Sequence, residues 1–239
     1  MPLLTDRVVL VTGASRGIGA AVALACAAEG ARLVLVARTR GGLEEVDDRV
    51  RAQGAPEPTL VQLDLTKGEL VDALGPALYQ KHGRLDGLVA CAGQLGRLSP
   101  VPHLEPKALE RLYALNVLAN HRLIRTLDPL LRASDAGRAV FLTDSRASVG
   151  PAFWGGYGAT KAALDVMVRA WAAESARITR LRVNLVDPGP VRTRLREDAY
   201  PGERAELLPT PAEVATRIVP LLAPAWDRCG ELVTLARDS

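Results

Sequence analysis

Short, continuous apolar runs alternate along this chain with segments of helical character. The runs cover residues 8–13, 31–38, 59–65, 85–93, 138–145, 181–189 and 230–236. An uninterrupted apolar run is typical of a strand buried on both faces, and a helix between consecutive strands makes them parallel. The pattern therefore predicts an α/β fold, a doubly wound parallel sheet of about seven strands with helices on both faces.

The segments between these runs have helical patterns. Helices are expected at residues 20–30, 42–53, 68–81, 106–132, 157–178 and 211–223. Residues 190–210 are polar and rich in Pro, which indicates a loop or a substrate lid. No repeat, low-complexity tract or linker divides the 239 residues, so we expect one domain spanning 1–239.

A glycine-rich turn joins the first predicted strand to the first helix. Gly13, Gly17 and Gly19 have the spacing G-x-x-x-G-x-G rather than G-x-G-x-x-G. Glycines let a backbone turn sharply and approach a pyrophosphate, and the helix that follows offers N–H donors and the positive end of its dipole. The alternative is a merely tight strand-to-helix turn, but the context favours dinucleotide binding.

The second strand indicates which dinucleotide is bound. It ends at Arg38 with no carboxylate to accept a bond from a ribose 2′-hydroxyl. Arg16 and Arg38 are suited to clamp a 2′-phosphate, unless both are simply solvated surface arginines. The sequence thus favours NADP(H) over NAD(H). Asp64, at the end of the third strand, is a candidate either to accept a bond from the adenine amino group or to cap its own loop.

Tyr157 and Lys161 are four residues apart, with Ser145 upstream. On a helix this spacing places the two side chains on one face, one turn apart. An ammonium there would lower the pKa of the phenol and make it a proton donor and acceptor near neutral pH. Such a spacing is common by chance, so its meaning depends on the rest of the chain.

Composition excludes several classes of function. The net charge is +3 and the basic residues are dispersed, which argues against a nucleic-acid partner. No run approaches the roughly 18 apolar residues of a membrane span. Cys26, Cys91 and Cys229 are expected to be reduced thiols, so we expect a cytoplasmic protein without a membrane partner. The three histidines have no ligand spacing, and no metal site is predicted.

Together these motifs resemble the short-chain dehydrogenase/reductase family in its short, single-domain form, over nearly the whole chain. The resemblance rests on TGASRGIG (12–19), LDL (63–65), LVACAG (88–93), LNVLAN (115–120), Ser145, YGATK (157–161) and DPGPVRT (187–193). The chain is most similar to bacterial oxidoreductases of unassigned substrate that carry a Trp three residues before the Tyr, as Trp154 does here. The resemblance implies a Rossmann fold that binds NADP(H).

The resemblance also implies catalytic roles. Tyr157 would be the general acid in carbonyl reduction and the base in alcohol oxidation, and Lys161 would lower its pKa and bond the nicotinamide ribose. Ser145 would orient the substrate oxygen, and Asn116 would support a water relay from Lys161. The cofactor-binding residues it implies are Gly13, Ser15, Arg16, Gly17, Ile18, Gly19, Arg38, Asp64, Leu65, Cys91, Ala92, Gly93, Tyr157, Lys161, Pro188, Gly189, Val191 and Thr193.

This sequence departs from the family pattern at three places. Ala90-Cys91 replaces the usual Asn-Asn before Ala-Gly, and the chain end lacks the Asp-Gly-Gly often seen there. Ser145 lies twelve residues before Tyr157, whereas the commonest spacing of thirteen falls on Asp144. An ionised carboxylate cannot donate a hydrogen bond, so Ser145 is predicted, with Ser148 a weaker candidate.

The sequence therefore predicts an oxidoreductase that transfers a hydride between NADP(H) and a small carbonyl or alcohol substrate. The alternative is a catalytically silent NADP(H)-binding sensor or scaffold. A sugar-nucleotide epimerase is disfavoured because the chain is too short for its second domain. The family relation implies a homodimer or homotetramer that pairs through helix 106–132 and the Tyr157 helix.

The substrate end of the site permits two interpretations. Arg192, Arg194 and Arg196 in the predicted lid form either a basic rim for an acidic substrate or acyl carrier, or an exposed charged loop. Phe153 and Trp154 form either an apolar wall of the site or part of the core or a subunit interface.

Overall fold

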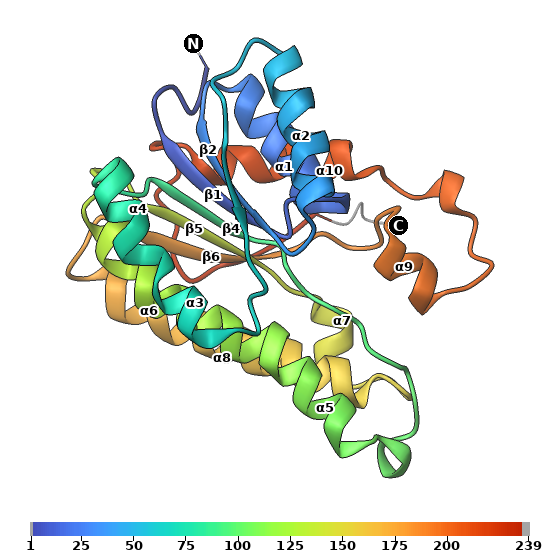
Figure 1. The fold of residues 1–239 in the computed structure, drawn as a ribbon. Helices are drawn as coiled ribbons and strands as arrows, with labels where there is room; N and C mark the ends of the chain where they lie inside the picture. Colours follow the sequence, from blue (N-terminus) through green and yellow to red (C-terminus); the bar gives the residue numbers. More distant parts are fainter. Residues whose placement is uncertain (1, 236–239) are drawn as a thin grey trace.

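The computed structural model describes residues 2–235 as a seven-stranded sheet between two layers of helices (Figure 1). The strands are β1 (Val8–Thr12), β2 (Arg32–Ala37), β3 (Thr59–Gln62), β4 (Gly87–Ala90), β5 (Arg138–Leu142), β6 (Arg182–Asp187) and β7 (Leu232–Thr234). Every neighbouring pair is parallel, and the order is β3-β2-β1-β4-β5-β6-β7. The doubly wound α/β sheet that the apolar runs predict is therefore confirmed.

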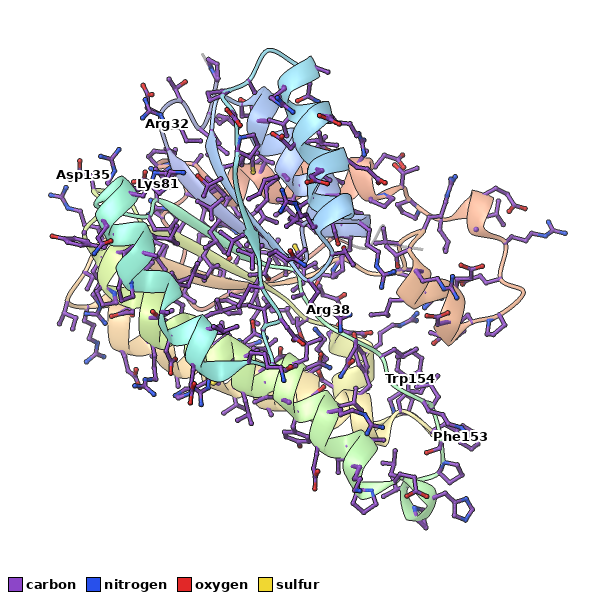
Figure 2. All side chains as sticks on the ribbon, in the orientation of Figure 1. Arg32, Arg38, Lys81, Asp135, Phe153 and Trp154 are labelled. Atoms are coloured by element: carbon purple, nitrogen blue, oxygen red, sulfur yellow. The ribbon has the colours of Figure 1, made fainter. Side chains whose placement is uncertain are left out.

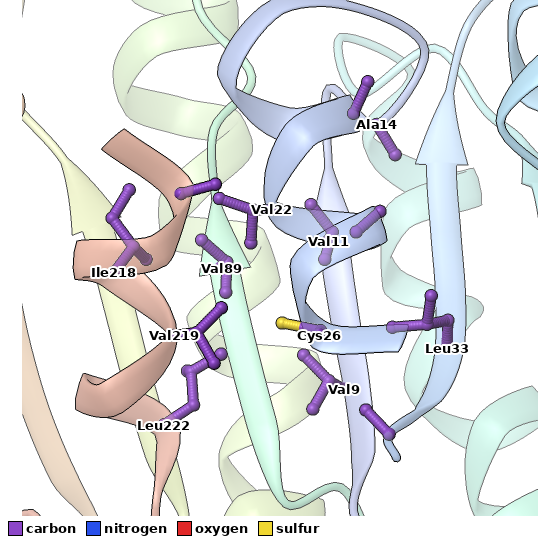
Figure 3. Close-up of a cluster of buried hydrophobic side chains, with 14 of the residues drawn as sticks. Val9, Val11, Ala14, Val22, Cys26, Leu33, Val89, Ile218, Val219 and Leu222 are labelled. Carbon is purple, nitrogen blue, oxygen red and sulfur yellow. The ribbon is translucent and has the colours of Figure 1, made fainter. Parts of the chain in front are cut away.

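The two faces of the sheet carry separate apolar cores. Alternate residues of β1 point to opposite faces, so Val9 and Val11 belong to one core and Val8 and Leu10 to the other. On the first face lie α1 (Gly17–Ala28), α2 (Arg40–Ala52) and α10 (Pro211–Ile218). Figure 3 shows this core, where Val22 and Cys26 of α1 and Ile218 of α10 cover β1 and β4.

The second face is covered by α4 (Leu74–His82), α6 (Ala119–Arg132) and α8 (Gly155–Ala176) (Figure 1). The sheet-facing side of α8 is buried at Leu164, Val168 and Trp171, and the Trp171 ring meets Phe141 of β5 edge to face. This strong apolar stripe fixes the rotation of α8, and with it the direction in which Tyr157 and Lys161 point.

Three predicted elements differ in detail. The segment expected as one helix over 106–132 contains a π-helical turn, η2 (Ala114–Leu118), between α5 (Pro106–Tyr113) and α6. The helix expected over 68–81 is two helices, α3 (Gly68–Asp72) and α4. The predicted lid holds a short helix, α9 (Arg194–Ala199), and a 3₁₀ turn (Ala205–Leu207). The remaining short elements are η1 (Val101–His103), α7 (Ser145–Ser148) and η4 (Val219–Leu222).

The strand order reverses its direction between β1 and β4. From β1 the chain builds outward to β2 and β3, and from β4 it builds the other way to β7. Helices on opposite faces leave a crevice at such a point, outside the carboxyl ends of the strands. This is where the fold is expected to place a ligand. None of the helices within residues 2–235 is both long and apolar enough to span a bilayer.

Candidate active site

A cavity of about 630 Å³ lies at the carboxyl ends of the strands. Its wall comes from the loops after β1, β2, β4, β5 and β6, and from Tyr157, Lys161 and α9. The contributing segments include residues 13, 15–19, 36–39, 91–93, 142–144, 146–147 and 187–196. Most of the predicted cofactor-binding and catalytic residues therefore line one continuous cavity. The exceptions are Asp64 among the cofactor-binding residues, and Asn116 and Ser145 among the catalytic ones.

The turn before α1 forms a cradle of open backbone groups. Helix α1 begins at Gly17, and no side chain caps its first N–H groups. Gly13 and Gly17 have φ values of +65° and +58°, which glycine adopts without strain. A Cβ on Gly19 would collide with the Gly13 carbonyl. Uncapped N–H donors at a helix start, approached through glycines, suit a pyrophosphate.

The far end of this cradle carries positive charge. Arg16 and Arg38 are exposed, line the cavity, and form no ion pair within the described residues. In Figure 2, Arg38 and Trp154 both lie away from Arg32, Lys81 and Asp135, which mark the opposite end of the molecule. Asp64 instead closes its own turn, with Oδ1 accepting from the Thr66 N–H at 3.0 Å and the Thr66 hydroxyl at 2.8 Å. These bonds lower the pKa of Asp64, and its contact with adenine stays a prediction.

The turn after β4 is braced without the usual Asn pair. The Ala92 N–H donates to Thr12 Oγ1 at 3.2 Å, and the Gln94 N–H donates to Asn116 Oδ1 at 3.0 Å. Asn116 Nδ2 in turn donates to the Gln94 carbonyl at 2.9 Å and to Thr160 Oγ1 at 3.0 Å. The π-helical turn that holds Asn116 thus fastens this loop to α8. Burial raises the pKa of the Cys91 thiol, which lines the cavity, to about 12.

Tyr157 and Lys161 lie side by side in the wall of the cavity. Both are nearly buried, with 5% and 7% of each residue exposed. Lys161 Nζ donates to the Leu142 carbonyl at 2.9 Å and lies 5.7 Å from the centre of the Tyr157 ring. The spacing argument for a shared helix face therefore holds in the structure.

The electrostatics of this pair differ from the expectation. Burial raises the pKa of Tyr157, and the carboxylates of Asp144 and Asp187 raise it further. Burial lowers the pKa of Lys161, against the opposing effect of the Asp144 carboxylate. The pKa of the phenol is therefore raised in this structure rather than lowered as expected, because the phenol is desolvated and two carboxylates oppose its ionisation.

Ser145 is held by a residue that the sequence did not single out. Its N–H donates to Asp187 Oδ2 at 3.1 Å, and its hydroxyl donates to the same oxygen. Asp187, at the end of β6, also accepts from the Gly189 N–H at 2.9 Å through Oδ1. The only sequence signal for Asp187 is its place at the start of the DPGPVRT segment. Ser145 as the group that orients the substrate remains a prediction.

Aromatic side chains form the wall of the cavity next to Tyr157. The Trp154 ring lies 5.8 Å from Tyr157 and 5.7 Å from Tyr200, between ring centres. Phe153, by contrast, is 57% exposed and does not line the cavity. Of the two neighbours, Trp154 therefore forms the predicted apolar wall.

Ion pairs within the lid engage two of the three arginines that form the predicted basic rim. Arg194 Nε lies 3.0 Å from Asp198 Oδ1. Arg196 bonds Glu203 through two nitrogens at 2.6 Å each and stacks on the Tyr200 ring at 3.7 Å. Within residues 2–235, Arg192 is the one member of the predicted basic rim without an ion pair. Over residues 2–235, no group of three or more His, Cys, Asp or Glu side chains is placed to hold a metal ion.

Comparisons of this chain with a family model, with known sequences and with solved structures agree with one another. A family model described as short chain dehydrogenase matches residues 7–204. An uncharacterized oxidoreductase of Escherichia coli K12, YciK, is 37% identical over 89% of this chain and 84% of its own length. A structure assigned to the short chain dehydrogenases from Pseudomonas syringae superposes with a TM-score of 0.95 at 35% identity, covering 98% of this chain and 96% of that one.

A second structure informs on the cofactor. A protein of the same class from Escherichia coli CFT073, in complex with NADPH, has a TM-score of 0.94 and 34% identity. The match covers 99% of both chains. The structural similarity between the two chains therefore includes the segments that line the cavity.

Proposed function

Because this chain belongs to the short chain dehydrogenase family of oxidoreductases, we propose that it transfers a hydride between NADP(H) and a carbonyl or alcohol substrate, with Tyr157 as the general acid and base. The observation that carries this proposal is one cavity with two parts. An uncapped glycine cradle lies at one end, and Tyr157 and Lys161 lie at the other. The NADPH complex of a protein with 34% identity supports the choice of cofactor.

The backbone N–H groups and arginines of the cradle are suited to bind a dinucleotide. The open N–H groups of residues 17–19 would bind the pyrophosphate, and Arg16 and Arg38 would bind a 2′-phosphate. Residues 187–193 would lie along the nicotinamide half. When bound, NADP(H) supplies or accepts the hydride, and the chain supplies position, field and protons.

The protein's part in carbonyl reduction is proton delivery. The phenol of Tyr157 donates its proton to the carbonyl oxygen while the carbonyl carbon gains the hydride, so the carbonyl becomes an alcohol and the cofactor ends oxidised. Because burial and two carboxylates raise the pKa of Tyr157, its protonated form is favoured, which suits reduction. Lys161 would contact the nicotinamide ribose, and Asn116 would order a path for the replacement proton.

One observation favours a second candidate, a silent NADP(H)-binding sensor. The hydroxyl of Ser145 is engaged by Asp187, and Ser145 does not line the cavity. Titration of bound NADPH fluorescence, followed by turnover of a panel of aldehydes and ketones, separates the two. Enzyme function predicts turnover that Tyr157→Phe abolishes with NADPH binding intact. Binding without any turnover that depends on Tyr157 would establish the sensor.

We also infer a cytoplasmic homodimer or homotetramer. All three cysteines are free thiols, which suits a reducing compartment. On α8, Ala159 and Ala170 are exposed and point away from the sheet, as do Leu118 after α5 and Val166. Such small and apolar side chains on neighbouring helices permit close pairing with a second copy. Sedimentation equilibrium tests this, and a monomer at all concentrations would contradict it.

A further inference from the structure

Asp144 presents an open acceptor to the cavity beside Tyr157. It is the N-cap of α7, where its Oδ1 atom accepts from the Ala147 N–H at 2.9 Å. In the described part of the chain, no donor reaches its Oδ2 atom, and the residue lines the cavity with Tyr157 and Lys161. The cavity that holds the proposed proton donor is therefore also lined by a carboxylate with an unengaged oxygen.

Ser145, the next residue, does not supply the cavity with a hydrogen-bond donor beside the Asp144 acceptor. The hydroxyl of Ser145 donates to Asp187, and Ser145 itself does not line the cavity. Asp144 and Asp187 both line the cavity with Tyr157, and their carboxylates raise the pKa of the phenol. Of Asp144 and Ser145, therefore, only Asp144 lines the cavity, and its carboxylate offers a substrate an acceptor.

A carboxylate next to the phenol constrains the substrate. A carbonyl oxygen is itself only an acceptor, so it can bond the Tyr157 hydroxyl but not an ionised Asp144. The group that lies against Asp144 must donate. Arg146 and Arg192 line the same cavity, are exposed and have no ion-pair partner within residues 2–235, so they disfavour a cationic donor. A neutral donor such as a hydroxyl fits both conditions.

Resting on the proposed function, we propose that Asp144 determines substrate specificity by accepting a hydrogen bond from a hydroxyl on the carbon next to the reacting carbonyl. The preferred substrates are then α-hydroxy ketones or aldehydes. The carbonyl carbon gains the hydride of NADPH, its oxygen gains the Tyr157 proton, and the neighbouring hydroxyl is unchanged, so the products are a vicinal diol and NADP⁺. The wall formed by Trp154 and Tyr200 suits an aryl or other flat apolar substituent on the carbonyl.

Three ketones on one scaffold test this proposal. α-Hydroxyacetophenone carries the donor, propiophenone replaces the hydroxyl by a methyl group, and phenacyl trimethylammonium carries a fixed positive charge without a donor. We expect kcat/KM for the hydroxy ketone to exceed that for propiophenone by about tenfold or more, since hydrogen bonds to charged groups are among the stronger ones. The cationic ketone should be the poorest of the three.

Variants assign the preference to Asp144. Asp144→Asn keeps a good helix cap but removes the charge, and should reduce the preference severalfold. Asp144→Ala should abolish it. Asp48→Asn, an exposed residue of α2 that lies outside the cavity, is the matched control and should behave as the wild type.

A pH profile separates this role from a structural one. The carboxylates that act on the phenol are Asp144 and Asp187 from β6. The titratable groups that act on the neighbouring Lys161 also include Asp165 from α8 and the Cys91 thiol, and Arg146 and Arg192 line the same cavity. Removing the Asp144 charge lowers the pKa of Tyr157, so oxidation of the diol by Asp144→Asn should set in at lower pH than in the wild type. Unchanged profiles would contradict the proposal.

The outcomes also separate this inference from the proposed function. Tyr157-dependent turnover of all three ketones without preference, or a preference for the cationic ketone, overturns the role of Asp144 and leaves the oxidoreductase intact. No Tyr157-dependent turnover across the carbonyl panel defeats the oxidoreductase, and the role of Asp144 with it.

Discussion

The two ends of the cavity are formed by different kinds of chemical group. The cofactor end is made of backbone, with glycines that permit close approach and helix N–H groups without a cap. The reaction end is made of side chains, where Tyr157, Lys161, Asp144 and Asp187 lie buried or half-buried among one another. Backbone geometry is fixed by chain direction and glycine position, whereas side-chain geometry depends on packing from several elements.

This difference predicts where substitutions act. Changes at the cofactor end should alter binding, because its groups contact phosphates that do not react. Changes at the reaction end should alter rate and pH dependence, because its groups hold or move a proton. Three experiments test this division, and a fourth tests the burial of Cys91 in the wall of the cavity.

Tyr157→Phe should have the largest effect. Loss of the phenol proton should lower kcat by about 10²- to 10⁴-fold, the usual range for a general acid. The Kd for NADPH should change by less than about twofold, because the ring and its packing remain. Tyr79→Phe, on the exposed side of α4, is the matched control. Equal loss of NADPH binding and rate in Tyr157→Phe would contradict the division.

Gly19→Ala should act on binding. A Cβ there meets the Gly13 carbonyl, so the turn must shift, and we expect NADPH to bind about tenfold more weakly or worse. The same crowding should cost about 1–3 kcal/mol of unfolding free energy in a urea titration. Gly41→Ala in α2 has open space around it and should leave binding unchanged. Normal NADPH affinity in Gly19→Ala would show that the turn is not the phosphate site.

Arg38→Ala should alter the choice of cofactor. We expect NADPH affinity to fall about tenfold, with NADH affinity nearly unchanged, because only NADPH carries the 2′-phosphate. Arg40, which pairs with Glu44 at 2.8 Å outside the cavity, provides the control variant Arg40→Ala. Tighter binding of NADH than of NADPH by the wild type would refute the cofactor argument.

The smallest effect concerns stability at alkaline pH. Burial raises the pKa of Cys91 from 9.0 to about 12, so the folded state holds its proton where the unfolded state loses it. The associated stability is present below about pH 9 and lost as the pH rises toward 12. Cys91→Ala should therefore show a shallower fall in unfolding free energy over this window, by at most about 1.4 kcal/mol per pH unit. Parallel curves would contradict the burial of this thiol.

The sequence was most informative where local pattern decides structure. Strands β1, β4 and β5 are buried at every position, so each contains a continuous apolar run from which a buried strand can be predicted. The glycine turn is equally local, since the conformation of Gly13 and the crowding at Gly19 are properties of a few consecutive residues.

Prediction fell short where distant elements meet. The π-helical turn at Asn116 has no signal in periodicity, because its bonds go to Gln94 and Thr160 on other elements. Ser145 satisfied a motif, yet Asp187, contributed by β6, holds its hydroxyl. The helix in the lid depends on the capping bond of Thr193 and on pairs such as Arg194 with Asp198, which a Pro-rich composition obscured.

The most direct test of Tyr157-dependent hydride transfer follows the hydride itself. NADPH deuterated at the transferable position of the nicotinamide ring is incubated with a ketone substrate and the wild type or Tyr157→Phe. We expect one deuterium on the carbinol carbon of the product for each NADPH oxidised by the wild type, and at least about a hundredfold slower labelling by Tyr157→Phe. Labelling at equal rates in both proteins, or NADPH bound with no label transferred to any carbonyl compound, would contradict the account.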